Sequence, residues 1–173
     1  GNYEYQKLEI AIDHSTPIGV LGNIRYGING GKIFGTAAYP FLKVHEGNQS
    51  YFLNKNTFNM LNFFEFVSDQ YVGAYLENHW QGLLFDRIPL VKKLKWRLVS
   101  TARATYGSIS NRHSREMLLP TFTKQFGNIP YVEASVGIEN IFKLLRVDVF
   151  YRVTHQLPGE SPWGIRARWE IYL

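Results

Sequence analysis

Arginine and carboxylate side chains recur at alternate positions along the C-terminal half of the chain. In residues 144–155, Arg146, Asp148 and Arg152 fall on one side of the alternation, and the other side is apolar. Because successive side chains of a β-strand point to opposite faces, this spacing predicts one charged face and one apolar face. The predicted charged face consists of Arg97, Arg103, Glu133, Glu139, Arg146, Asp148, Arg152, Arg166, Arg168 and Glu170.

Two kinds of chemistry fit a face of this composition. Opposite charges on neighbouring strands can pair across a sheet and form a ladder of salt bridges that stiffens a wall. Alternatively, rows of arginine can line an anion-selective passage. We favour the ladder, because no single residue of the set specifically indicates a pore.

The sequence contains no pattern that indicates an enzyme or a bound metal. No two histidines have the i, i+2 or i, i+4 spacing with which a strand or a helix holds one metal ion. The nearest approach to a catalytic set is His79 with Glu77 and Ser68, but positions 77 and 79 share a face in any strand. The absence of cysteine excludes thiolate zinc sites and disulfides. We predict no catalytic residues, no metal and no cofactor, although an active site assembled from separate strands stays open.

The composition fits a strand-rich protein better than a helical membrane protein or a nucleic-acid-binding protein. Aromatic residues make up 16% of the chain, and no uninterrupted apolar run approaches the ~18 residues needed for a membrane helix. The net charge is +5, but the basic cluster at residues 92–97 is short and the other arginines are spread singly. We therefore predict no nucleic-acid partner.

Apolar and polar residues alternate in about seven segments, which predicts an all-β fold of long antiparallel strands. Many segments reach the ~9–11 residues with which a strand crosses a membrane obliquely, whereas strands of globular proteins are usually about 5–6 residues long. The predicted strands are residues 7–14, 22–35, 71–85, 95–108, 130–140, 144–155 and 163–173.

The connections between these strands alternate in length, with the shorter turns predicted at one end and the longer loops at the other. That arrangement is typical of outer-membrane β-barrels. The predicted turns are residues 17–20, 85–93 and 139–143, and the predicted loops at the opposite end are residues 36–68, 109–129 and 156–162.

These features predict an antiparallel transmembrane β-barrel whose charged face lines the lumen and whose apolar face contacts lipid. Aromatic residues near the strand ends support this orientation, and the predicted lipid-facing residues are Trp96, Tyr151, Trp163 and Trp169. A soluble lipid-binding β-barrel, in which the apolar face is a core, is the alternative. Seven strands leave two unpaired edges, which lipid does not tolerate. We therefore expect residues 1–173 to be the C-terminal portion of a larger barrel, with undetected strands or assembly of several chains as alternatives.

The long connection at residues 36–68 is too apolar for an ordinary solvated loop. It is predicted either to fold into the lumen as a plug that contacts the arginine wall, or to cap the mouth of the barrel without gating it. Both alternatives stay open. If the segment enters the lumen, Glu46 or Glu65 is expected to pair with an arginine of the wall.

Several stretches resemble a known family of Bacteroidetes-type outer-membrane proteins of unknown function. They are GKIFG at residues 31–35, residues 58–97 and residues 130–155, and the resemblance runs from about residue 20 onward. Members of that family carry a carboxypeptidase-regulatory-like domain ahead of a C-terminal barrel. The resemblance implies an integral protein of the bacterial outer membrane, related to BamA-like barrels, and it implies no catalytic residues.

Two functions follow as alternatives from this resemblance and from the residue patterns. The first is a non-enzymatic outer-membrane barrel that helps to assemble proteins in that membrane or to move molecules across it. The second is a fragment of a TonB-dependent receptor-type transporter. In either case the expected partners are outer-membrane lipid and other outer-membrane or periplasmic proteins.

Overall fold

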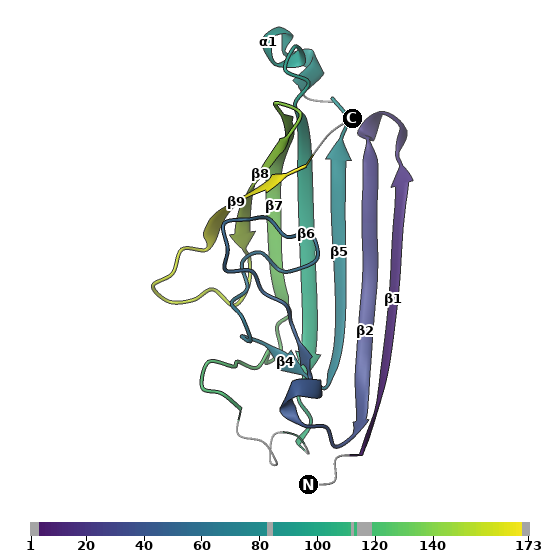
Figure 1. The fold of residues 1–173 in the computed structure, drawn as a ribbon, viewed down its shortest axis with the longest axis vertical. Coiled ribbons are helices and arrows are strands. Elements are labelled where there is room, and N and C mark those ends of the chain that lie inside the picture. Colours follow the sequence, from purple (N-terminus) through teal and green to yellow (C-terminus); the bar gives the residue numbers. More distant parts are fainter. Residues whose placement is uncertain (1–3, 83–84, 112, 114–118, 171–173) are drawn as a thin grey trace.

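The computed structural model describes residues 4–82, 85–111, 113 and 119–170, and its main element is one antiparallel sheet of seven strands (Figure 1). The strands follow one another across the sheet in chain order, so each pairs with its neighbours in sequence apart from two short strands that lie outside the sheet. The strands of the sheet are β1 (Tyr5–Pro17), β2 (Asn23–Gly35), β5 (Gln70–Trp80), β6 (Arg97–Ser108), β7 (Tyr131–Ile141), β8 (Leu145–Arg152) and β9 (Trp163–Trp169).

The predicted all-β fold and its antiparallel strands are confirmed, with boundaries that shift by a few residues. The predicted strand at residues 71–85 ends earlier, at Trp80. The predicted strand at 163–173 is described as far as Trp169, and its residues 171–173 lie outside the described part of the chain. Trp96, predicted inside a strand, lies directly before β6.

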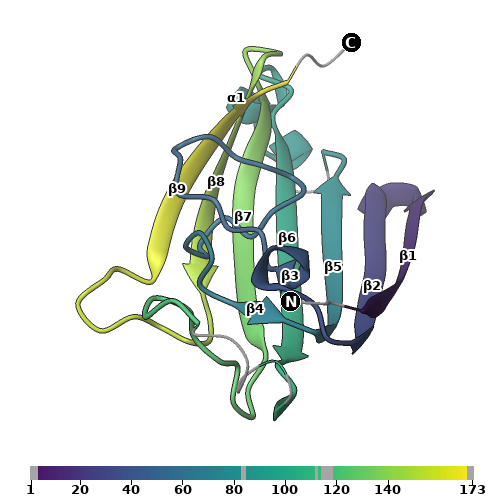
Figure 2. The same ribbon diagram turned by 60° about the horizontal axis from the view of Figure 1, so that its bottom comes forward.

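The sheet is curved but open, so the predicted barrel is not closed by these seven strands (Figure 2). The outermost strands are β1 and β9, and within the described residues they do not pair with each other. At the outer edge of β9, the backbone of Ala167 bonds to another segment of the chain. Its N–H donates to the carbonyl of Tyr51 (3.0 Å), and its carbonyl accepts from the N–H of Leu53 (2.8 Å).

The connections divide between the two ends of the sheet as the sequence predicts. One end carries the turn with η1 (Gly19–Leu21), the connection with η3 (Phe85–Arg87) and α1 (Pro89–Lys92), and the tight turn after β7. The other end carries the connections between β2 and β5, between β6 and β7, and between β8 and β9 (Figure 1). In the described parts of the chain, no helix has the length and apolar character to cross a membrane.

The connection between β2 and β5 folds back over one face of the sheet instead of extending away from it (Figures 1 and 2). It contains η2 (Tyr39–Phe41) and two short strands, β3 (Lys43–Val44) and β4 (Val67–Ser68), which pair with each other. Residues 43–66 are called the covering segment below. Two clusters of buried hydrophobic residues lie around this connection. The first consists of Ile33, Ala37, Leu42 and Val67, and the second, which includes two residues of the covering segment, consists of Leu61, Phe66, Phe126 and Tyr131.

The two faces of the sheet have opposite chemistry, and the polar one is largely buried on β5 to β8. The covered face is called the charged face, and the other the apolar face. Buried side chains of the charged face include Glu77, Thr101, Glu133, Ser135, Glu139, Arg146, Asp148 and Arg152. Exposed side chains of the apolar face include Leu8, Ile10, Ile12, Ile28, Val72, Leu76, Val136, Val149 and Ile165. Soluble proteins show the opposite distribution, because burial removes apolar surface from water.

The turn between β1 and β2 allows a test of the fold at two glycines. Gly22 has φ 96° and ψ −138°, and an added Cβ would collide with the carbonyl of His79. Gly19 has φ 53° and open space around it. We expect Gly22→Ala to lower the free energy of unfolding by more than about 3 kcal/mol and Gly19→Ala by about 1 kcal/mol. Denaturant titration of both variants measures the difference, and equal losses would contradict this account of the turn.

Candidate functional site

The structure brings the predicted charged residues together on one face, at registers fixed by the strand pairing. Arg103 of β6 lies opposite Glu133 of β7, which in turn lies opposite Arg152 of β8. Asp148 of β8 lies opposite Arg166 of β9. The remaining members share this face: Glu139 and Arg146 are buried, Arg168 is half-buried, Arg97 is exposed at the start of β6, and Glu170 is half-buried directly after β9.

The predicted lipid-facing residues lie away from the charged face. Tyr151 and Trp163 are register partners on β8 and β9, with ring centroids 4.4 Å apart. Trp169 lies at the other end of β9 and is exposed like Trp163. Trp96 is half-buried in front of β6.

Glu133 ties the covering segment to the sheet. Its carboxylate accepts hydrogen bonds from the backbone N–H groups of Asn59 (2.8 Å) and Met60 (2.9 Å), and from the Tyr131 hydroxyl (3.0 Å). Charge-assisted hydrogen bonds of this kind are roughly twice as strong as neutral ones. The buried carboxylate therefore receives its donors from a loop backbone and from its own strand.

Arg152 forms the second connection to the covering segment. Its guanidinium makes a bidentate ion pair with Glu65, at 2.7 and 3.1 Å, and it also donates to the carbonyl of Met60 (3.1 Å). The expected pairing of a segment carboxylate with a wall arginine is confirmed for Glu65. It is wrong for Glu46, which is 62% exposed and pairs with Lys43 (3.8 Å), because that carboxylate points away from the sheet.

The pKa of Glu65 lies below its ordinary value although the side chain is buried. Burial alone would raise this pKa, because it disfavours the charged form. The hydrogen bonds and the charge of Arg152 outweigh burial and lower it, with smaller contributions from the N–H of Asn62 and from Lys124. The ionised carboxylate is therefore the form that holds the segment.

Three further contacts join the segment to the wall. The Arg166 guanidinium donates to the carbonyl of Asn59 (2.9 Å), and Arg103 donates to the carbonyl of Lys55. The Lys55 ammonium pairs with Glu170 (2.6 Å). Wall arginines thus bind backbone carbonyls of the segment, which differs from the predicted ladder between neighbouring strands.

A second charged network lies on the same face, around Arg146. The Arg146 guanidinium pairs with Asp148 on its own strand (2.8 Å) and with Glu77 on β5 (3.1 Å). His79 lies between two carboxylates, with Nε2 3.0 Å from Glu77 and Nδ1 2.9 Å from Glu139. Each buried charge is therefore next to an opposite one, which offsets the cost of removing it from water.

The structure does not bring together His79, Glu77 and Ser68, the nearest approach to a catalytic set in the sequence. His79 does contact Glu77, but the Ser68 hydroxyl bonds to Nε2 of His45 instead (3.0 Å). The other ring nitrogen of His45 bonds to the hydroxyl of Thr105 (3.1 Å). Burial lowers the pKa of His45 to about 3, so its ring is neutral at physiological pH.

Sequence reasoning missed a cluster of Ser110, His113 and Asp69. His113 Nδ1 lies 2.8 Å from the Asp69 carboxylate and 3.2 Å from the Ser110 hydroxyl. Nε2 accepts the backbone N–H of Ala37 (3.0 Å), so it is not available as a base, and the cluster links two loops. No local pattern indicates this contact, because Asp69 and Ala37 come from the connection between β2 and β5, and Ser110 and His113 from the connection between β6 and β7. Among the described residues, no group of three or more His, Asp or Glu side chains is placed to hold a metal ion.

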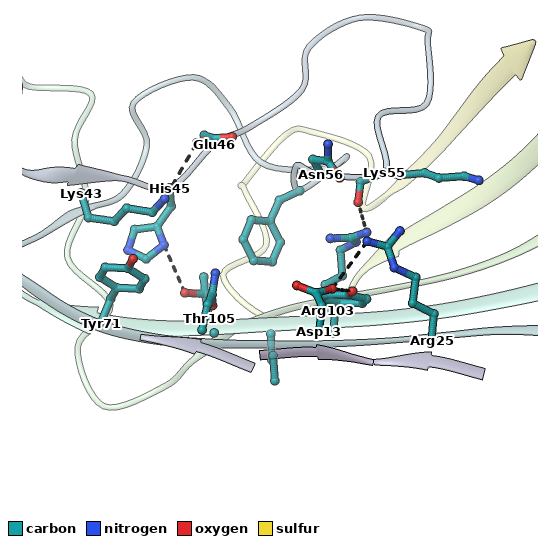
Figure 3. A pocket seen from close by; sticks show the side chains of 16 residues that line it. Asp13, Arg25, Lys43, His45, Glu46, Lys55, Asn56, Tyr71, Arg103 and Thr105 are labelled. Carbon is teal, nitrogen blue, oxygen red and sulfur yellow. Dashed lines mark hydrogen bonds and ion pairs between the residues drawn. The ribbon is translucent and has the colours of Figure 1, made fainter. Parts of the chain in front are cut away.

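A cavity of about 300 Å³ lies between the covering segment and strands of the sheet (Figure 3). Gly73, which has no side chain, contributes to its floor, and Phe58 and Asn56 line it from the segment. The charged side chains that line it are Asp13, Arg25, Lys43, Glu46, Lys55 and Arg103. Sequence reasoning placed Arg103 on the wall but could not predict the cavity, which exists because the segment folds back.

The chain matches the model of a protein family of unknown function, the C-terminal domain of DUF5686, over residues 1–117. The chain belongs to this family. The match spans β1 to β6 and contains the resemblance noted at residues 31–35 and 58–97, whereas the stretch at 130–155 lies beyond it. No curated protein and no solved structure matches the chain.

The contact between Glu65 and Arg152 gives a prediction for the covering segment. Glu65→Gln keeps the shape of the side chain but removes the charge that Arg152 binds. We expect hydrogen exchange at the amides of Asn59 and Met60 to accelerate about 10- to 100-fold, because hydrogen bonds to charged groups contribute about 1.5–3 kcal/mol. Glu46→Gln in the same segment is the matched control, with a change of about twofold or less. Equal effects of both variants would contradict the docking role of Glu65.

The pH dependence of hydrogen exchange at the Asn62 amide follows from the lowered pKa of Glu65. A carboxylate whose pKa is lower in the docked state stabilises that state at neutral pH, and the stabilisation is lost as the pH falls. After correction for intrinsic rates, we expect constant protection of the Asn62 amide, which donates to Glu65 (3.2 Å), from neutral pH down to the ordinary carboxylate range, about pH 4.3, and a loss below it. Glu65→Gln should remove this acid dependence. A loss that begins near pH 6.5 would point to histidine instead.

Proposed function

We propose that this chain is a non-enzymatic integral protein of the bacterial outer membrane. Its sheet is the C-terminal part of a larger β-barrel, with the apolar face against lipid and the charged face toward the interior. The covering segment fills the interior beside the charged wall. We further propose that the protein acts in the assembly of outer-membrane proteins or in transport across that membrane.

The observation that carries the proposal is the reversed distribution of side chains across the sheet. Apolar side chains are exposed on the strands from β1 to β9, while glutamates, aspartate and arginines are buried on the opposite face. Water would make this exposure unfavourable, whereas lipid would favour it. The aromatic side chains Trp163 and Trp169 at the two ends of β9 suit the interfacial regions of a bilayer.

The free edge of the sheet supports closure by additional strands. β1 has 13 residues and pairs only with β2 among the described strands. Unpaired backbone groups have no hydrogen-bonding partner in hydrocarbon, so an open edge is not tolerated there. The matched family model describes a C-terminal domain, which fits a sheet that continues in other parts of a longer protein.

The position of the covering segment favours a plug over a cap. Its contacts reach Glu133 and Arg166, which lie within β7 and β9 rather than at the rim of the sheet. The plug of a TonB-dependent receptor would come from a separate upstream domain, whereas this segment lies between two strands of the sheet. A soluble lipid-binding barrel would need the apolar face inside its curve. These features favour the first function over both alternatives.

A substitution at Val136 tests the membrane proposal. Val136 lies within β7 on the apolar face and is 56% exposed. We expect Val136→Arg in the full-length protein, folded into lipid vesicles, to lower the free energy of unfolding by about 2–4 kcal/mol, because arginine is costly near the bilayer midplane. Val136→Leu is the matched control and should be neutral.

The same pair of variants also identifies the alternative outcome. An exposed valine on a water-facing surface tolerates arginine within about 0.5 kcal/mol. If Val136→Arg folds as stably as Val136→Leu, the apolar face is not in lipid and the membrane proposal is wrong.

A further inference from the structure

The cavity between the covering segment and the sheet has the dimensions and the lining of a small-molecule site. Its volume of about 300 Å³ is at the lower end of the range for ligand pockets, about 300–1,000 Å³. The rings of Phe58, Tyr71 and Tyr75 line it together with charged groups (Figure 3). Gly73 contributes no side chain to the floor, which leaves room above the strands.

Positive charge exceeds negative charge in the lining. Four basic side chains line the cavity, Arg25, Lys43, Lys55 and Arg103, against the carboxylates of Asp13 and Glu46. Three of the basic groups have carboxylate partners. These pairs are Arg25 with Asp13 (3.5 Å), Lys43 with Glu46 (3.8 Å) and Lys55 with Glu170 (2.6 Å).

Arg103 is the basic group without a carboxylate partner in the described part of the chain. Its register partner is Glu133, whose carboxylate accepts the N–H groups of Asn59 and Met60 instead. Arg103 donates to the carbonyl of Lys55 and lies 5.1 Å from the centre of the Tyr75 ring. The docking of the covering segment therefore leaves a guanidinium at the cavity that makes no direct ion pair, although the charges of Glu133 and Glu77 act on it from a distance.

The second guanidinium of the cavity is held at the same ring. Arg25 lies 5.5 Å from the centre of the Tyr75 ring, so both arginines lie against the same ring. Planar guanidinium groups bind the paired oxygens of phosphates and carboxylates through two parallel hydrogen bonds. Lys43, at the other end of the cavity, adds a third positive charge.

We propose that this cavity binds a small water-soluble anion that carries a phosphate or carboxylate group. Arg103 is its main contact, and Arg25 and Lys43 flank it. The cavity lies on the charged face, on the opposite side of the sheet from the exposed apolar residues. A free solute therefore reaches it, and the headgroup of a lipid packed on the apolar face does not.

Calorimetric titration of the full-length protein in micelles of an uncharged detergent tests the proposal. The probes are inorganic phosphate, citrate and glucose 6-phosphate, with glucose as the uncharged control. We expect at least one charged probe to bind with a Kd below about 1 mM, more weakly at higher salt, and glucose not to bind. No binding by any of the three charged probes would overturn the proposal. If no soluble probe binds but an anionic lipid added to the micelles does, the site takes a lipid headgroup, and this result would also overturn the proposal.

Two variants and one control variant locate the site. Arg103→Gln should weaken binding about tenfold or more, whereas Arg87→Gln, at an exposed arginine outside the cavity, should change it by about twofold or less. Gly73→Val fills the floor without changing any charge, and a Cβ added at this position makes a close approach only to the end of the Asn29 side chain. It should abolish binding, and it keeps the test decisive if Arg103→Gln fails to fold. Equal losses in Arg87→Gln and Arg103→Gln would show nonspecific attraction and overturn the proposal.

The result is independent of the membrane proposal. Stability of Val136→Arg in vesicles reports on the apolar face, and anion binding reports on the cavity. Either can fail while the other holds.

Discussion

The hydrogen bonds from the backbone of Asn59 and Met60 to the carboxylate of Glu133 organise the charged face. Because Glu133 is occupied in this way, neither neighbouring arginine has it as its principal partner. Arg152 turns to Glu65 of the covering segment, and Arg103 turns to the carbonyl of Lys55. The segment is therefore held by the same charges that would otherwise have to be neutralised between strands.

This arrangement explains how a sheet can bury so many charged groups. A buried ion is costly unless opposite charges and hydrogen bonds surround it. Around Arg146 the compensation comes from Asp148 and Glu77, and around Arg152 it comes from a loop that lies far away in sequence. The covering segment thus supplies charges and hydrogen-bonding groups that compensate the buried charges of the charged face. Its removal would expose several unpaired charges at once, so docking is expected to be cooperative.

The apolar face has no such counterpart within the described residues. Its exposed side chains extend from Leu8 on β1 to Ile165 on β9. A sheet that is charged within its curve and apolar outside suits a protein whose surroundings are lipid. The cavity at Arg103 adds a polar compartment on the inner side, and its excess of positive charge suggests a use beyond mechanical stiffness.

The sequence by itself determined the strands, their two faces and the division of turns and loops between the two ends. These features depend on the period of two along a strand, which is a local property of the chain. It also indicated that a carboxylate of the covering segment would meet an arginine.

Only the tertiary structure decided which groups meet. Glu65 rather than Glu46 pairs with the wall, the edge of β9 bonds to residues 51–53, and the cavity forms beside Arg103. Asn59 and Glu133 are 74 positions apart in the chain. Contacts over such separations depend on how the segment folds back across the sheet, and alternation within a single strand contains no information about that path.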